Sequence, residues 1–439
     1  VKIMKKIIII LVALIVLVTG GCSLIQKQQF PPEFSIKPPS ANLALSGGTL
    51  KSVFSQTPIV VGDADAFAVM QNITKDNRTE RTITWQSKLP RPMSFLEYRE
   101  QGHSDVLKIT AKQNEFATDQ GKKYQHIIRI SGLKGNTSYE YRINDGKDYT
   151  AWETFNTDNG VRTKALIFPD SQSVDYGTWA RTAKMAWAKN PDAQFFINMG
   201  DLVDNGEQYW QWARWLEAVD GMIEKIPLAP IIGNHEDYTL NWKMTEPHTY
   251  LNLFTLPANG IEDFNEYFYS YDYGDVHFTV IDTQKEELAE FKPDLFAREL
   301  AWAEKDLAST NKPWKVVLMH KHIFNFRVDG SFNEIGDTFM PLFDKYKVDV
   351  VFTGHIHSYR RTVPLYEGVA AEKGTIYIST GAAGERLRVN GPKQISLEAA
   401  VNPQPSLPNY LVLETNAGEM KIQAFTQKGE EIDSVSLKK

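Results

Sequence analysis

The chain has 439 residues, of which 42% are hydrophobic, 12% aromatic and 23% charged. This composition excludes a disordered chain and supplies enough apolar material for buried cores, and the length suggests two or three domains. The net charge of −6 and the lack of long basic runs argue against a nucleic-acid polymer as a partner. A single cysteine excludes a disulfide scaffold and a cysteine-rich metal site.

Residues 1–22 have the features of an export signal. Three lysines precede an apolar run over residues 7–18, and small residues then lead to Cys22, the only cysteine. At about 1.5 Å per residue, this run is too short for a hydrocarbon layer of about 30 Å. The arrangement resembles a bacterial lipoprotein signal, so we expect an exported protein that is lipidated at Cys22 and faces the cell surface or the periplasm. An ordinary signal peptide with a chance cysteine is the alternative.

The next two segments predict a tether and a β-domain. Residues 23–49 contain four prolines without sustained periodicity, which indicates a tether. Residues 50–158 alternate apolar and polar residues in short segments between turns, which predicts a β-sandwich. Trp85 and the paired tyrosines at 139 and 141 resemble a fibronectin type III-like module, which we interpret as a structural spacer rather than a substrate-binding unit. The strands expected in this module lie at 82–86, 124–130, 138–143 and 149–155.

Residues 163–439 predict an α/β domain. Continuous apolar runs alternate with helical patterns, as in strands that are covered on both faces. One helix face is expected from Tyr209, Trp212, Ala213, Leu216 and Ile223. The tail from 409 returns to a strand-turn-strand pattern that would complete a sheet of the same domain. The other expected strands lie at 165–168, 195–199, 231–232, 276–281, 316–319, 348–352 and 376–379.

Polar side chains follow five of these apolar runs at the point where each run ends. In open α/β sheets the carboxyl ends of the strands line one crevice, so these side chains can converge. Carboxylate and amide oxygens together with imidazoles suit a pair of Zn²⁺, Mn²⁺ or Fe²⁺ ions, whereas Ca²⁺ prefers oxygen ligands alone. The candidate residues are Asp170, Asp201, Asn234, His235, His320, His355 and His357.

These residues stand in the order and spacing of the calcineurin-like metallophosphoesterases, which the chain resembles through GNHE at 233–236 and GHIH at 354–357. The preceding sandwich makes it more similar to the purple acid phosphatase branch. The resemblance implies an α/β fold, an αββα sandwich of two mixed sheets, preceded by the all-β fibronectin type III-like sandwich. It also implies a binuclear metal centre and a small-molecule phosphate ester as substrate.

The resemblance further assigns a role to each candidate. Asp201 would bridge two metal ions, Asp170 and His357 would hold the first ion, and His235 would face the substrate as a proton donor. The second ion would be held by Asn234, His320 and His355. Two such ions lower the pKa of a shared water, so the expected reaction is attack of a metal-bound hydroxide on phosphorus. An imidazole that binds no metal is suited to protonating the leaving group.

Two positions depart from the family pattern. Purple acid phosphatases carry a tyrosine three residues after the bridging aspartate, where this chain has Asp204. We therefore expect two divalent ions (Mn, Fe or Zn) rather than a purple Fe(III)-tyrosinate centre, with Asp204 as a cap or supporting group more than a ligand. Many related enzymes have histidine where this chain has Gln172, whose amide oxygen is a weaker ligand, so Gln172 is an uncertain member of the metal set.

Several nearby residues keep two interpretations. His322 either lines the phosphate pocket or is satisfied locally. Arg360 and Arg361 either contact phosphate or pair with acids, and we favour pairing. Four other side chains lie near motif ends and could shape a substrate pocket without any ranking among them: Lys321, Tyr238, Trp242 and His248.

The sequence thus predicts an exported, membrane-anchored phosphoesterase that acts as an acid phosphatase-like enzyme or a phosphodiesterase. The alternative is a non-catalytic cell-surface binding module with a degenerate phosphoesterase domain. The departures at Gln172 and Asp204 are the only support for that alternative.

Overall fold

The computed structural model describes residues 65–325, 331–387, 394–402, 407–416 and 418–439. The expected signal with Cys22 and the expected tether lie outside the described residues. Within the described part of the chain, no helix is both long and apolar enough to cross a membrane.

An N-terminal β-sandwich is built from eight strands. Their inward faces form one core, in which Trp85, Leu96 and Tyr141 are almost fully buried, except that Phe116 belongs to the larger core of the α/β part. One layer is a four-stranded sheet in the order β4-β3-β7-β8, comprising β3 (Phe95–Glu100), β4 (Leu107–Thr110), β7 (Ser138–Asn144) and β8 (Glu153–Asn156). The other layer contains β1 (Phe67–Asn72), β2 (Arg81–Ser87), β5 (Lys112–Thr118) and β6 (Gly121–Ile130).

The second of these layers continues into the α/β part of the chain. β1 pairs in parallel with β11 through Asn72 and Leu228, which makes one ten-stranded sheet in the order β23-β22-β21-β9-β10-β11-β1-β2-β6-β5. Three short central strands of this sheet are parallel and buried: β9 (Lys164–Phe168), β10 (Phe195–Asn198) and β11 (Leu228–Pro230). The C-terminal strands add an antiparallel edge: β21 (Asn409–Asn416), β22 (Glu419–Thr426) and β23 (Glu431–Lys438).

A seven-stranded mixed sheet forms the second layer of the α/β part, in the order β12-β13-β14-β15-β19-β16-β20. Phe195 on β10 contacts Tyr271 and Phe278 of this sheet with ring centroids 5.9 and 5.5 Å apart, so the two sheets pack face to face. The strands are β12 (Tyr269–Tyr273), β13 (Val276–Ile281), β14 (Trp314–Met319), β15 (Val350–Thr353), β16 (Tyr359–Thr362), β19 (Ile376–Thr380) and β20 (Glu398–Asn402). A small separate hairpin joins β17 (Leu365–Tyr366) to β18 (Val369–Ala370).

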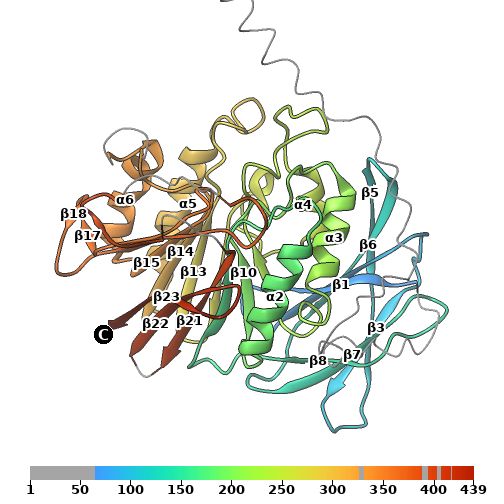
Figure 1. The fold of residues 1–439 in the computed structure, drawn as a ribbon. Helices are drawn as coiled ribbons and strands as arrows, with labels where there is room; N and C mark the ends of the chain where they lie inside the picture. The colour runs from blue at the N-terminus through green and yellow to red at the C-terminus, as the bar shows by residue number, and fades with distance from the viewer. Residues whose placement is uncertain (1–64, 326–330, 388–393, 403–406, 417) are drawn as a thin grey trace, which may run out of the picture. The chain divides into compact units, whose positions relative to one another are not determined.

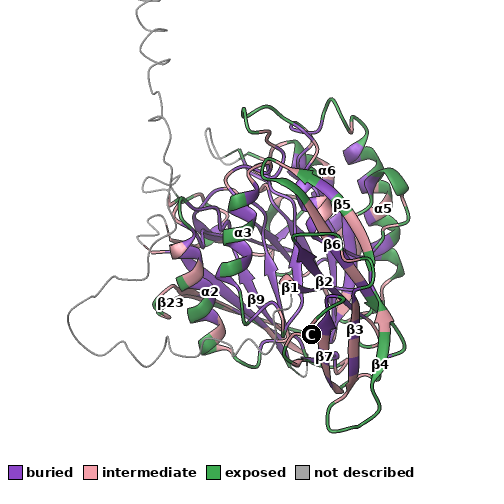
Figure 2. Ribbon diagram, turned by 90° about the vertical axis from the view of Figure 1, so that its right-hand side faces the viewer, coloured by how far each residue is buried: buried purple, intermediate pink, exposed green. Residues whose placement is uncertain are grey.

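Helices cover the outer faces of both sheets (Figure 1). α2 (Gly177–Lys189) packs on β9 and β21 and against α3 (Tyr209–Ala218), whereas α5 (Leu295–Ser309) packs on β13 and against α6 (Glu334–Tyr346). Figure 2 shows the exposed outer sides of α2 and α3 in green and the buried strand β9 in purple. The αββα architecture and the preceding sandwich confirm the expected fold class. The remaining helical segments are α4 (His248–Leu253) and the 3-10 turn η1 (Glu262–Phe264).

Three local expectations were wrong. Residues 231–232 were expected to form a strand, but they follow it, since β11 covers Leu228–Pro230. The expected strand at 149–155 is shorter, since β8 begins at Glu153. Before it, Tyr149 forms only an isolated bridge with Asn144, and the backbone N–H of Thr150 donates to the oxygen of Ile143 at 2.9 Å. The helix face is also narrower: α3 ends at Ala218, before Ile223, and Ala213 is exposed whereas Trp215 is buried.

Candidate metal centre

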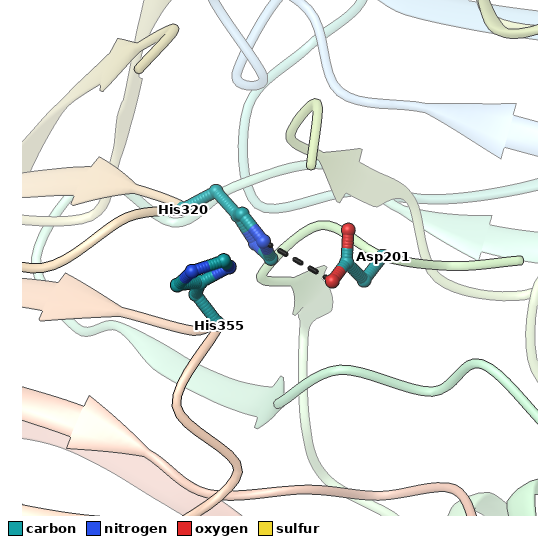
Figure 3. Close-up of side chains that lie close together, drawn as sticks. All are labelled: Asp201, His320 and His355. Carbon is teal, nitrogen blue, oxygen red and sulfur yellow. Dashed lines mark ion pairs between the residues drawn. The ribbon is translucent and has the colours of Figure 1, made fainter. Parts of the chain in front are cut away.

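The strand-end residues converge at the carboxyl edges of the two sheets. Asp201, His320 and His355 place one ligand atom each within 4.8 Å of one another, and Asp170, Asp201 and His357 do the same. Asp201 belongs to both clusters. It comes from the loop after β10, whereas the histidines follow β14 and β15. Figure 3 shows the His320 imidazole facing the Asp201 carboxylate, with a dashed line for their ion pair, and the His355 ring beside that of His320.

The backbone around the clusters is tightly packed and locally strained. A Cβ at Gly233 would lie 2.2 Å from the Asp201 nitrogen, and one at Gly354 would lie 2.4 Å from Asp170 Oδ1, so only glycine allows these loops to meet. Asp201, His355 and His357 have φ values of 50°, 68° and 50°. Left-handed non-glycine residues are uncommon and cluster at functional sites, so the strain coincides with the expected ligands.

The first cluster joins Asp170 to His357. His357 Nε2 lies 3.0 Å from Asp170 Oδ2, while its Nδ1 contacts the backbone oxygen of Arg386. The backbone N–H of His355 donates to both carboxylate oxygens of Asp170 at 2.9 Å. The Arg386 carbonyl therefore fixes the ring so that Nε2 faces the carboxylates, an arrangement that is common for metal-binding histidines.

The second cluster collects two imidazoles around one amide oxygen. Asn234 Oδ1 lies 2.9 Å from His355 Nδ1 and 3.3 Å from His320 Nε2, and His320 Nε2 is 3.2 Å from Asp201 Oδ2. His320 Nδ1 lies 2.8 Å from the backbone oxygen of Met199, which orients the ring as Arg386 does in the first cluster.

Burial and charge act in opposite directions on these groups. Burial alone would raise the pKa of Asp201, but the neighbouring imidazoles, His320 above all, hold that pKa well below its usual range. Burial opposes the charge on His320, yet Asp201 raises the pKa of His320 to about 10. Burial and then the charge of His320 lower the pKa of His355 to about 2. Asp201 is thus ionised beside the neutral imidazole of His355, and a bound cation would displace the proton of His320.

These donors fit two divalent transition-metal ions. Each cluster offers carboxylate oxygen together with imidazole nitrogen, a combination that suits Zn, Mn or Fe. Asp201 belongs to both clusters, so its carboxylate would be available to both ions. The amide oxygen of Gln172 is buried without a hydrogen-bond partner, which leaves it available as a further ligand.

His235 lies beside the clusters without belonging to either. Its backbone N–H donates to Asp201 Oδ1 at 2.9 Å, and its Nδ1 lies 2.7 Å from the backbone oxygen of Asp204. Because that oxygen can only accept, Nδ1 carries a proton and Nε2 is directed elsewhere, 3.3 Å from the Gln172 amide nitrogen. Asp204 is outside both metal clusters and caps no helix, since Gln208 precedes α3, and its carboxylate pairs with Arg386 at 2.7 Å.

The other sequence candidates separate in the structure. His322 accepts from the backbone N–H of Phe324 at 3.1 Å, and its ring lies 6.4 Å from that of His355. Arg360 and Arg361 pair with acids, Glu398 and Asp433, at 2.5 and 2.6 Å. Lys321 Nζ pairs with Glu287 at 2.7 Å, Tyr238 and Trp242 contact the His235 ring, and His248 begins α4.

Glu236 is a supporting residue that sequence reasoning missed. Its carboxylate accepts backbone N–H groups from Asp201 and Gly233 at 2.8 Å and from Leu202 at 2.9 Å. Burial, and then the charge of Asp201, raise the pKa of Glu236 to about 8. The only sequence signal was its place in the GNHE motif, which does not show that the side chain turns back onto the previous loop.

Comparison with known proteins identifies the class that this fold and these clusters define. Residues 163–359 match the model of the calcineurin-like phosphoesterases, and residues 67–157 match the purple acid phosphatase N-terminal domain. The two matched segments make this chain a calcineurin-like metallophosphoesterase, a hydrolase, with a purple acid phosphatase N-terminal domain.

Similar proteins support the same grouping. The chain is 26% identical to purple acid phosphatase 22 of Arabidopsis thaliana over 81% of this chain and 77% of that protein. It is 28% identical to probable inactive purple acid phosphatase 27 of the same plant, over 70% of this chain but only 59% of the relative. The fold resembles that of purple acid phosphatase PPD1 from yellow lupin (Lupinus luteus) seeds, with a TM-score of 0.73 and 21% identity. The match covers 85% of this chain and 74% of the lupin protein. A structure of PhoD has a similar fold, with a TM-score of 0.61 and 12% identity. The match covers 85% of this chain and 93% of the PhoD chain.

Proposed function

We propose that this protein hydrolyses small-molecule phosphate esters with the help of two divalent transition-metal ions. The observation that carries the proposal is the position of Asp201, whose carboxylate belongs to both Asp/His clusters. When bound, such a pair of ions supplies Lewis acidity and an activated water for displacement at phosphorus.

The remaining ligands divide between the two ions. Asp170 and His357 would hold the first ion, with Gln172 as a further oxygen donor that is weaker than imidazole. Asn234, His320 and His355 would hold the second. The two carboxylates contribute a charge of −2, so two divalent ions leave a net positive centre that attracts an anionic ester to an acidic protein.

His235 would donate a proton to the leaving oxygen. Its Nδ1 proton is held by the backbone oxygen of Asp204, which fixes the ring. In the imidazolium form Nε2 carries the second proton, and this is the proton that would pass to the leaving oxygen and leave a neutral imidazole. The amide of Gln172, 3.3 Å from Nε2, and the ion pair between Asp204 and Arg386 limit how far this ring can turn.

The test is hydrolysis of a panel of phosphate monoesters and diesters by protein loaded with Mn²⁺, Zn²⁺ or Fe²⁺. We expect turnover that a chelator abolishes and metal restores. His235→Asn should lower kcat by roughly 100- to 10,000-fold without changing metal content. If metal-loaded protein cleaves no ester, the binding-module alternative replaces this proposal. If His235→Asn retains full activity, the proton-donor role is wrong.

We also propose that the protein is exported and anchored to a membrane by a lipid on Cys22. Support comes from the sequence alone: lysines, a short apolar run, small residues and then the only cysteine. Cys22→Ser should move the protein from the membrane fraction to the soluble exported fraction. If the native protein and Cys22→Ser both remain in the membrane fraction until detergent is added, lipid anchoring through Cys22 is contradicted.

A further inference from the structure

A tight hairpin follows the GNHE motif and carries a tryptophan at its tip. Tyr238 and Met244 form an antiparallel bridge at the base of this hairpin. The backbone N–H of Thr239 donates to the oxygen of Lys243, and that of Trp242 donates to the oxygen of Thr239, both at 2.8 Å. The hairpin is therefore a closed and internally bonded turn.

Contacts with the loop after β10 hold the hairpin beside the metal clusters. Asn205 Nδ2 donates to the backbone oxygen of Thr239 at 2.7 Å. The backbone N–H of Leu240 donates to Glu207 Oε2 at 3.0 Å. Since Asp201 and Asp204 belong to the same loop, the position of the hairpin is coupled to the part of the chain that presents Asp201.

Two aromatic rings of the hairpin stand at the edge of the His235 imidazole. The Trp242 ring lies 6.1 Å from His235 at an interplanar angle of 90°, and the Tyr238 ring lies 5.7 Å away at 88°. Tyr238 and Trp242 are themselves 5.7 Å apart. Trp242 remains 53% exposed, so an aromatic surface beside His235 is open to solvent.

The turn itself does not require a tryptophan at this position. Trp242 has a φ of 58°, in the left-handed region that glycine adopts without strain and a bulky side chain does not. Its exposure also means that it contributes little to a buried core. A strained and exposed tryptophan next to the proposed proton donor points to a role for the side chain rather than for the backbone.

We propose that Trp242, with Tyr238, forms a subsite for an aromatic leaving group of the phosphate ester. This inference rests on the proposed function. His235 would protonate the leaving oxygen, so the group attached to that oxygen must lie on the His235 side of phosphorus. The surface next to His235 on that side is aromatic, and indole rings bind planar aromatic groups by stacking or edge-to-face contact. The preferred substrates are therefore esters whose alcohol carries an aryl or heteroaryl ring.

The test compares benzyl phosphate with cyclohexylmethyl phosphate. Both release a primary alcohol of similar size and basicity, but only benzyl phosphate carries a planar aromatic ring. We expect the native protein to prefer benzyl phosphate in kcat/KM. Trp242→Leu should reduce this preference by roughly three- to tenfold, and Trp242→Phe should retain most of it. Trp152→Ala is the matched control, because it removes a tryptophan that contacts Arg99 and Arg142 in the N-terminal sandwich. It should leave the preference for benzyl phosphate unchanged.

A second variant separates binding from stability. Trp242→Gly relieves the left-handed strain, so the melting temperature should stay the same or rise while the preference for benzyl phosphate disappears. A melting temperature lowered by several degrees would show that the indole supports the fold, and would overturn the subsite. An unchanged preference in Trp242→Leu would overturn the subsite alone. Cleavage of other phosphate esters of the panel but of neither of these two by metal-loaded native protein would overturn this inference and leave the proposed function standing, whereas cleavage of no ester at all would overturn both.

Discussion

The carboxylate of Glu236 holds two strand-end loops together from behind the candidate ligands. It accepts backbone N–H groups from both the Asp201 loop and the Gly233 turn, and it is almost fully buried. The backbone of Asp201 has a left-handed conformation, and its carboxylate belongs to both clusters. The position of Asp201 therefore depends on the hydrogen bonds to Glu236. Groups that orient metal ligands in this way commonly affect affinity almost as much as the ligands do.

Glu236→Gln should lower metal affinity by roughly 10- to 100-fold. The substitution replaces one acceptor oxygen with an NH₂ group that faces backbone donors, so the Asp201 loop loses bonds and shifts. Affinity is measured by competition with a chromogenic chelator above pH 8, where the Glu236 carboxyl is ionised and both of its oxygens accept. Glu266→Gln is the control, because Glu266 is a glutamate outside the clusters that accepts from the backbone of Leu256 at 3.0 Å. Equal affinity in native protein and Glu236→Gln would contradict this role.

At the residue scale, the sequence was informative where a polar side chain follows a buried run. Asp170, Asp201 and His320 could be selected because a strand end fixes where such a side chain lies relative to the sheet. The function of Glu236 and the place of Trp242 beside His235 depend on how a loop folds back. Periodicity carries no information about that, and Trp242 could not be distinguished from His248.

Four elements meet at His277, away from the candidate metal centre. His277 on β13 lies between Asp272 of β12 and Asp306 of α5, with nitrogen-to-oxygen distances of 2.7 and 2.9 Å. Asp306 also accepts from Thr279 at 2.9 Å, and Lys75, from the turn after β1, lies 3.7 Å from it. The His277–Asp306 pair is therefore buried, and the largely exposed side chain of Lys75 links it to the sandwich.

Stability should depend on pH through this cluster. Burial alone would lower the pKa of His277, but Asp272 and Asp306 raise that pKa above its usual value. The imidazolium is favoured in the folded state, so its contribution is complete below the unfolded pKa of about 6.5 and is lost as pH rises through the folded value. His277→Gln should cost about 3 kcal/mol at pH 6 and progressively less at higher pH.

Urea unfolding of native protein and His277→Gln from pH 6 to pH 9 measures this difference. His103→Gln is the control, because His103 is an exposed histidine whose Nε2 lies 3.8 Å from the Glu100 carboxylate. The control should show a small difference that does not change with pH. A His277→Gln difference that stays constant or grows with pH would contradict the assignment of an ionised His277.

At the element scale, the type of most elements was predictable and their ends were not. β13 and β14 are continuous buried runs, and a doubly covered strand produces that pattern directly. β11 is only three residues long and is followed by two apolar residues, Ile231 and Ile232. The apolar pattern therefore predicted the strand at these two residues instead of at Leu228–Pro230. The aromatic residues of α3 similarly concealed that the helix ends at Ala218.

The N-terminal sandwich and the α/β part form one structural unit. The described residues, from residue 65 onward, fall in a single compact unit, and β1 joins the ten-stranded sheet beside β11. Side chains reinforce the junction: Tyr141 donates to the backbone oxygen of Glu224 at 2.8 Å, and Gln125 donates to that of Leu253 at 3.0 Å. The sandwich therefore completes the fold as well as preceding it.

We expect one cooperative unfolding transition for both parts. Removing the sandwich would expose the edge of β11 and the apolar residues that cover it, so residues 159–439 alone should be insoluble or aggregated. Differential scanning calorimetry of the full chain and solubility of the fragment test this. Two separate transitions, or a soluble fragment with native circular dichroism, would contradict the account.

At the scale of the whole molecule, sequence patterns identified two kinds of architecture but not their continuity. The change from alternating to continuous apolar runs near residue 160 falls between β8, the last strand of the sandwich, and β9, the first strand of the α/β part. The joint between β1 and β11 is a parallel pairing with a single register pair, Asn72 and Leu228, which lie 156 residues apart. No local pattern reports a contact of that separation, so the sandwich was interpreted as a spacer.

The most direct test of the central claim is the metal content of native protein and of Asp201→Ala, measured by elemental analysis after loading and desalting. A binuclear centre that shares Asp201 predicts about two transition-metal ions per native chain, most of both lost in Asp201→Ala, and about one retained in His357→Ala. Circular dichroism should show that the variants remain folded. Native protein without transition metal after loading, or Asp201→Ala with the native metal content, would contradict the account.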